Sequence, residues 1–128
     1  MRVVFDANVV VNAVLHPHSA EGRLLDLAIS DGCTLLYDDE LLREYDEALS
    51  RKTLALPPAA VADLIESLAD AGLSIPTASR ERVKRPAAAG VALDGCADAL
   101  VTDAGTPRVA HAPQLQVCTA ARLLAELL

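Results

Sequence analysis

The sequence predicts an α/β fold, a three-layer α/β/α sandwich with a mainly parallel central sheet of four to five strands. Short apolar runs, often β-branched, alternate with longer segments that have the apolar spacing of amphipathic helices. The intervals between the runs are long enough for crossover helices, which favour parallel strands with helices on both faces. The length of 128 residues predicts a single domain spanning residues 1–128.

The first half of the chain contains the clearest elements. The run Arg2–Asp6 is apolar and β-branched, and it predicts a buried strand. Ser19 and either Asp38 or Asp39 are predicted helix N-caps, and a pair of prolines opens the last helix of this half. The remaining elements are then a helix over 8–15, a helix over 19–28, a strand over 33–37, a helix over 39–50 and a helix over 56–71.

The pattern is weaker after residue 76. Residues 80–86 contain four basic side chains, and the Ala/Gly-rich stretch that follows has little helical definition. Two short apolar runs, 99–102 and 115–118, predict a third and a fourth strand. A short helix over 120–128 closes the chain.

Composition and charge exclude some classes of nucleic-acid binding. Aromatic residues make up 2% of the chain and Trp is absent, which argues against a base-stacking platform. The net charge of -7 argues against broad electrostatic attraction to nucleic acid. Any phosphate contact must therefore be local.

The cysteines and the apolar segments bear on the compartment. Cys33, Cys96 and Cys118 have no metal-ligand spacing, and we expect them to be buried thiols of a reducing compartment. No segment has the run of apolar residues that a membrane span needs, and the amino terminus does not resemble a signal peptide. We expect a cytoplasmic protein that does not bind membranes.

Three acids are candidates for a common site. Asp6 ends the first strand and Asp103 follows the third, and ligands of parallel sheets gather beyond the carboxyl ends of the strands. Glu44 lies roughly 60° outside the apolar arc of its helix, at the edge of the buried face. Each has an ordinary alternative: an Asp at a strand end often caps the next helix, and a lone Glu at a helix edge is usually solvated.

A cluster of these acids would require a cation. Like charges about 4 Å apart repel by roughly 4 kcal/mol at an effective dielectric constant near 20. Carboxylate oxygens with room for water and phosphate suit Mg²⁺ or Mn²⁺. The chemistry indicated is metal-assisted phosphodiester hydrolysis.

Three segments of the sequence are informative in combination. The opening strand continues into an Asp-x-Asn signature at Asp6 and Asn8, residues 39–52 form a second block, and residues 97–102 form an Ala-Asp-x-x-Val-Thr segment. Together they resemble the PIN-domain nucleases, in particular the branch of toxin components of toxin–antitoxin systems, with 39–52 similar to the second block of that family and 97–102 to the segment before its last acid. With residues 117–120 similar to the closing strand and helix, the resemblance covers essentially the whole chain.

The resemblance implies a set of roles and partners. Asp6 and Glu44 fall on the family's first two metal-binding acids, Asn8 on a supporting polar residue, and Thr102 on the hydroxyl residue near the last acid. It further implies Mg²⁺ or Mn²⁺ as the cofactor and single-stranded RNA as the substrate. A cognate antitoxin and a second copy of the chain are the partners that it implies.

Two expected acids are replaced or shifted. An ungapped count places Arg82, Lys84 and Arg85 across the expected acidic start of a helix, with Arg85 at the third acid. The family's Val-Thr-Gly-Asp ending reads Val-Thr-Asp-Ala here, which leaves Asp103 one position early and Ala104 at the expected acid.

These replacements change the charge of the predicted site. Asp6, Glu44 and Asp103 with Arg85 sum to about -2, where four acids would give about -4. A guanidinium can pair with carboxylates without a metal. The sequence therefore predicts a PIN fold with an eroded metal site whose activity is weak or lost.

Other interpretations remain open. Arg82, Lys84 and Arg85 are either RNA-backbone contacts or a solvated loop, and His16, His18 and His111 are expected in exposed loops. A non-catalytic module that binds RNA or a protein is the alternative function. A receiver-like signalling domain is weaker because no Lys follows the last strand, and a dinucleotide-binding domain is excluded because the turn after the first strand contains no glycine.

Overall fold

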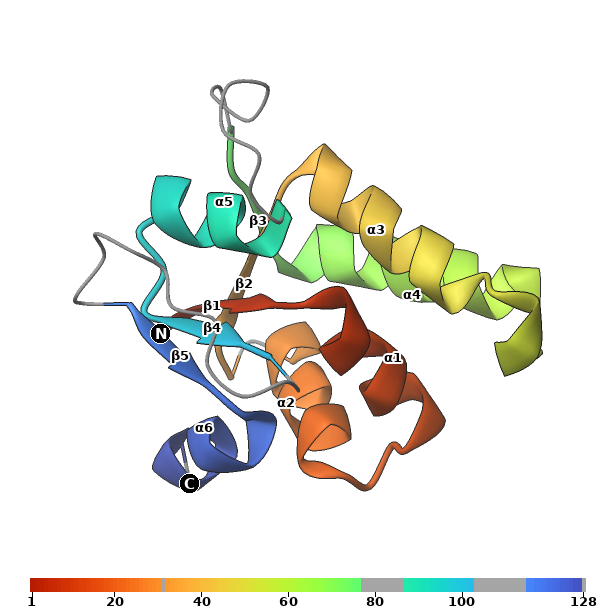
Figure 1. Cartoon of the computed structure of the whole chain (residues 1–128), viewed down its shortest axis with the longest axis horizontal. Helices are drawn as coiled ribbons and strands as arrows, with labels where there is room; N and C mark the ends of the chain where they lie inside the picture. Colours follow the sequence, from red (N-terminus) through yellow and green to blue (C-terminus); the bar gives the residue numbers. More distant parts are fainter. Residues whose placement is uncertain (31, 77–86, 103–114, 128) are drawn as a thin grey trace.

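A five-stranded parallel sheet forms the centre of the computed structural model, which describes residues 1–30, 32–76, 87–102 and 115–127 (Figure 1). The strand order is β3-β2-β1-β4-β5, and each neighbouring pair is parallel. The strands are β1 (Arg2–Phe5), β2 (Thr34–Tyr37), β3 (Leu73–Ser74), β4 (Ala99–Val101) and β5 (Gln116–Cys118).

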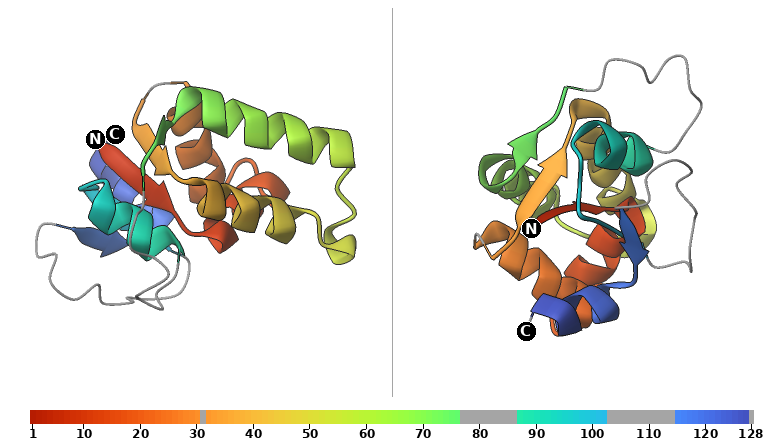
Figure 2. Two further views of the ribbon diagram at one scale, coloured as in Figure 1. Left: turned by 90° about the horizontal axis from the view of Figure 1, so that it is seen from above. Right: turned by 90° about the vertical axis from the view of Figure 1, so that its left-hand side faces the viewer.

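Helices cover both faces of this sheet. Figure 1 shows α5 on one side of the strands and α2 and α6 on the other, and the two views of Figure 2 agree. α3 and α4 lie side by side, and α1 directly follows β1. The predicted α/β sandwich is therefore confirmed. The helices are α1 (Ala7–Leu15), α2 (Ala20–Ile29), α3 (Asp39–Leu49), α4 (Pro58–Ala71), α5 (Ala87–Asp94) and α6 (Ala120–Leu127), with a 3-10 turn η1 (Lys52–Leu54).

The interior of the sheet is apolar on both faces. Val3, Val4 and Phe5 of β1 are buried, as are Leu35 and Leu36 of β2. A continuous apolar run is what a parallel strand covered by helices on both sides requires. The apolar runs and helical segments that alternate in the sequence thus form the sheet and the helices that cover it.

The predicted caps of two helices are confirmed. The Ser19 hydroxyl accepts from the Gly22 N–H at 3.3 Å and begins α2. Asp38, rather than Asp39, caps α3, because its Oδ1 accepts from the Leu41 N–H at 2.8 Å. A cap of this kind satisfies one of the N–H groups that the first helical turn leaves unpaired.

Three features differ from the sequence expectation. β3 has only two residues, too few for a periodic signal, and α5 forms in the Ala/Gly-rich stretch where the sequence indicated little helix. The alanines of α5 have high helix propensity, but a stretch that is apolar up to Asp94 has no amphipathic pattern. Cys96 is exposed instead of buried, because it lies in the turn after α5 with φ of 51°. Cys33 and Cys118 are buried as expected.

The strand order reverses at β1. The chain adds β2 and β3 on one side of β1 and then returns to place β4 and β5 on the other. Such a switch point opens a crevice beyond the carboxyl ends of the two central strands, because their connections leave in opposite directions. Asp6 follows β1 and Thr102 follows β4 at this position.

Candidate functional site

Asp6 is fixed at the carboxyl end of β1 by its backbone and by both carboxylate oxygens. Its N–H donates to the Val101 carbonyl at 2.9 Å. Oδ1 accepts from the Ala7 N–H at 2.8 Å and caps α1, while Oδ2 accepts from the Thr102 hydroxyl at 3.4 Å. Asp6 therefore caps α1 and also lies at the end of β1, so the capping role does not exclude it from a site there.

Glu44 lies at the edge of the buried face of α3. Leu41, Tyr45, Ala48 and Leu49 are buried on that helix, and Glu44 is half-buried beside them, as the helical spacing predicts. The strongly amphipathic sequence of α3 fixes which face packs inward. It thereby fixes the direction in which Glu44 leaves the helix.

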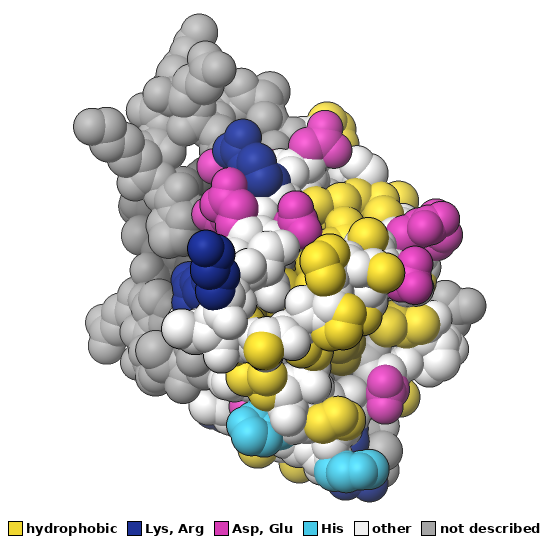
Figure 3. Space-filling view, turned by 90° about the vertical axis from the view of Figure 1, so that its right-hand side faces the viewer, with side chains coloured by type: hydrophobic (Ala, Val, Ile, Leu, Met, Phe, Trp, Pro, Cys, Tyr) yellow, Lys and Arg dark blue, Asp and Glu magenta, His cyan; other side chains and the backbone are white. Residues whose placement is uncertain are grey.

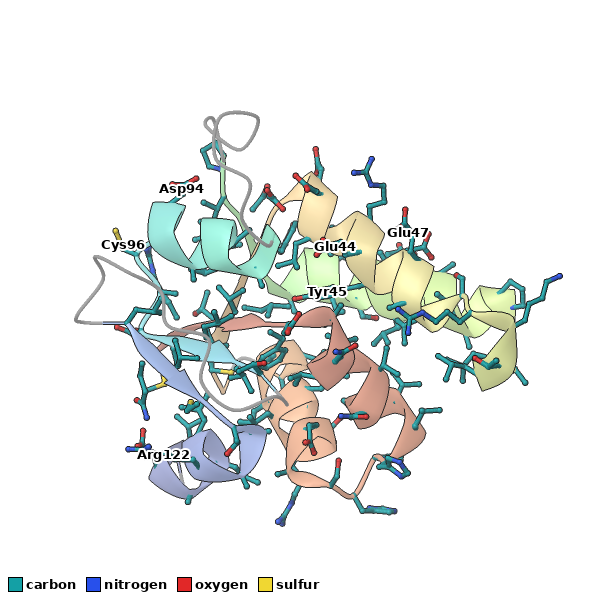
Figure 4. All side chains as sticks on the ribbon, viewed as in Figure 1. Glu44, Tyr45, Glu47, Asp94, Cys96 and Arg122 are labelled. Carbon is teal, nitrogen blue, oxygen red and sulfur yellow. The ribbon has the colours of Figure 1, made fainter. Side chains whose placement is uncertain are left out.

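Asp6 and Glu44 line the same hollow, which has a volume of about 420 Å³. Two further charged residues of the hollow are Glu47 and Arg51. Glu44 and Glu47 are three residues apart on α3, so they share a face of the helix, which Figure 4 shows. Glu47 is exposed, and the sequence analysis did not place it at the site.

The rest of this wall is made of methyl groups. Ala7 and Ala48 come from α1 and α3, and Ala88 comes from the first turn of α5. Ala88 brings a third helix to the hollow but adds no ligand. No signal in the sequence marked this position, because the periodicity of α5 is weak.

Tyr45 connects the elements that bear the two acids. It is fully buried, its hydroxyl donates to the Phe5 carbonyl, and Figure 4 shows it between α3 and the end of β1. Burial raises the pKa of Tyr45 well above that of an exposed tyrosine, and the charges of Asp6, Glu44 and Asp38 raise it further. Both candidate acids therefore act on the same hydroxyl.

The other predicted site residues have different outcomes. Thr102 is buried and contacts Asp6 as described, whereas Asn8 is exposed on α1 and does not line the hollow. The remaining candidates lie outside the residues that the structure describes, namely Asp103, Ala104, Arg82, Lys84 and Arg85.

Acids and histidines elsewhere do not join this site. Asp98 lies at the opposite end of the sheet, where its Oδ2 accepts from the Arg2 N–H at 2.8 Å. Asp94, labelled in Figure 4, is the last residue of α5, whereas Ala88 is in the first turn of that helix. His16 and His18 are exposed in the loop after α1, and His111 is outside the described ranges.

The donor chemistry of the hollow fits a hydrated divalent cation. Carboxylate oxygens such as those of Asp6 and Glu44 are hard ligands, and Mg²⁺ usually keeps several waters and takes only one or two carboxylates. In the part of the chain that the structure describes, no three His, Cys, Asp or Glu side chains are close enough to hold one ion. Asp6 and Glu44 are the two predicted carboxylates that the structure brings to this hollow.

A separate apolar hollow of about 410 Å³ lies between α3 and α4. Leu42 and Ile65 line it, with Arg43, Asp46 and Glu66 among its polar neighbours. Figure 3 shows apolar side chains gathered on this side of the molecule, with charged side chains around them.

Among the described residues, no helix has the length and apolar character that crossing a membrane requires.

Comparison with known families identifies the fold. A family model described as "PIN domain" matches residues 2–104, which include Asp6, Glu44 and Thr102. The chain belongs to the PIN-domain family, whose fold is of the nuclease type. PIN domains in general depend on a divalent metal. No curated protein and no solved structure matches the chain.

The raised pKa of Tyr45 predicts a loss of stability at alkaline pH. As the pH rises past about 10, the unfolded chain releases the Tyr45 proton while the folded chain retains it. This contribution to stability is complete below pH 10 and is lost as the pH rises toward the folded-state pKa. Urea unfolding from about pH 8 to about pH 11 should therefore show a smaller alkaline loss for Tyr45→Phe than for the wild type. Equal losses would contradict the prediction.

Proposed function

We propose that this chain is a toxin-type PIN-domain endoribonuclease for single-stranded RNA, with a reduced metal site and weak activity. The 128 residues form one PIN-like domain in this proposal, and Asp6, Glu44 and Asp103 are its carboxylates. The observation that carries the proposal is the meeting of Asp6 and Glu44, far apart in the sequence, in one hollow at the switch point of the sheet.

Each residue of the hollow has a defined part in this proposal. Asp6 and Glu44 hold the cation, and the Thr102 hydroxyl orients the second oxygen of Asp6. A bound Mg²⁺ or Mn²⁺ supplies charge neutralisation and an activated water for phosphodiester hydrolysis. Arg51 is the basic side chain that lines this hollow. It contacts a phosphate of the RNA backbone, because a guanidinium pairs well with phosphate oxygens.

The site is reduced on the side of α5. Ala88 lines the hollow with a methyl group. A carboxylate at this position would add a third metal ligand to Asp6 and Glu44 among the residues that the structure describes. This observation also supports the second candidate, a non-catalytic PIN-like module that binds RNA or a protein. The partners proposed for either form are single-stranded RNA, a cognate antitoxin and a second copy of the chain.

The first test removes one proposed ligand. Asp6→Asn keeps the shape of the side chain and the oxygen that caps α1, so it removes charge with little change in packing. We expect Mn²⁺-dependent cleavage of single-stranded RNA to be lost, and Mn²⁺ affinity by calorimetry to fall at least about tenfold. Asp63→Asn, at an exposed position of α4, is the control. Cleavage that survives Asp6→Asn would overturn the assignment.

The second test introduces a carboxylate at the α5 wall. Ala88→Asp places a buried acid beside Asp6 and Glu44, so it should destabilise the protein without metal and raise its Mn²⁺ affinity about tenfold, or 1.4 kcal/mol. Thermal unfolding with and without Mn²⁺ measures both effects. Ala125→Asp, exposed on α6, adds the same charge away from the site. An unchanged Mn²⁺ affinity in Ala88→Asp would show that this wall is not a ligand position.

The third test concerns Arg51 and the RNA backbone. Arg51→Ala should weaken the binding of single-stranded RNA for all sequences and lower the slope of log affinity against log salt by about 0.7, the value for one phosphate contact. Arg43→Ala is the matched control, because Arg43 is an exposed arginine of α3 that lines the other hollow. Equal effects of the two substitutions would mean that Arg51 acts only through net charge.

A further inference from the structure

One hydrogen bond joins the two chain segments that carry Asp6 and Glu44. Tyr45 directly follows Glu44 on α3, and Phe5 directly precedes Asp6 at the end of β1. The Tyr45 hydroxyl donates to the Phe5 carbonyl. The bond therefore links the immediate neighbours of both acids.

We propose that Tyr45 is a positioning residue, whose hydroxyl holds Glu44 and Asp6 at the separation that a shared divalent cation needs. The inference rests on the proposed function for the role of the cation, while the positioning itself concerns residues of this chain alone. Tyr45 contacts neither substrate nor cation in this account. It acts through the placement of the two acids.

The surroundings of the hydroxyl explain why no other group can replace it. Tyr45 is fully buried, and so is Phe5, which leaves no water to accept or donate in place of the missing partner. The other observed hydrogen bonds of Asp6 join it to the Val101 carbonyl, the Ala7 N–H and the Thr102 hydroxyl, and none of these groups belongs to α3. The distance from the Asp6 backbone to α3 thus depends on Tyr45 and on the packing of the helix.

The chain contains a matched control for the loss of a buried tyrosine hydroxyl. Tyr37, the other tyrosine, is also buried, and its hydroxyl donates to the Ala69 carbonyl at 2.8 Å. That bond ties β2 to α4, and neither Tyr37 nor Ala69 lines the hollow with the acids. Tyr37→Phe and Tyr45→Phe therefore make the same chemical change at the same kind of bond, in two different places.

The first measurement is the affinity for Mn²⁺ alone, by calorimetry on the full chain. Tyr45→Phe should weaken Mn²⁺ binding about tenfold or more, the range for partners that orient a metal ligand, whereas Tyr37→Phe should leave it unchanged. Urea unfolding at neutral pH checks that both variants are folded and lose similar stability. If the wild type binds Mn²⁺, an equal affinity in Tyr45→Phe would overturn the proposal.

The second measurement needs no metal. A double-mutant cycle of Asp6→Asn and Glu44→Gln, by urea unfolding, isolates the repulsion between the two acids from the contacts that each makes elsewhere. We expect a clear coupling in the wild type and in Tyr37→Phe, and a smaller one in Tyr45→Phe, where the acids can move apart. An absent coupling in the wild type, or an undiminished one in Tyr45→Phe, would contradict the positioning role.

The two measurements separate this inference from the proposed function. A coupling that depends on Tyr45, in a protein that does not bind Mn²⁺, would reject the metal site and retain the positioning role. If Tyr45→Phe is unstable, both measurements are made in a stabilising osmolyte for all variants. A Tyr45→Phe chain that stays unfolded there would also overturn the proposal, because the hydroxyl would then hold the whole fold rather than the site.

Discussion

The burial of β1 on both faces is the constraint from which the site follows. A strand with buried Val3, Val4 and Phe5 must lie inside the sheet with helices above and below. Because the chain adds strands on both sides of β1, the end of this strand becomes the switch point. Asp6 is the first residue beyond the buried run, so the hydrophobic core itself delivers a carboxylate to the crevice.

The charge of the hollow depends on several elements at once. Asp6 comes from the end of β1, Glu44 and Glu47 come from α3, and Arg51 follows that helix. A chain with a net charge of -7 repels a polyanion at long range, so a local cation is needed for contact with RNA. In the proposed function a divalent ion at the carboxylates and the guanidinium of Arg51 meet that need.

The side chains of helix α5 bear on the choice between the two candidate functions. It contributes a methyl group, that of Ala88, to the hollow that Asp6 and Glu44 line. With two described donors, a cation depends on water for most of its coordination, and its binding is sensitive to the spacing of those donors. In the proposed site, the hydrogen bond from Tyr45 to Phe5 would therefore matter more than it would in a site with more ligands.

Much of the fold was predictable because its signals are local. Apolar runs, caps such as Ser19 and the amphipathic pattern of α3 predicted the strands and helices, the strand-end position of Asp6 and the edge position of Glu44. The parts of the site that were not predicted are Glu47, Arg51, Ala88 and Tyr45. Their meeting depends on contacts between segments distant in sequence, which periodicity does not encode. Sequence alone determined most of the strands and helices and the acids at their ends and edges. Tertiary structure decided which side chains face one another, because only the order of the strands brings α3 and α5 to the end of β1.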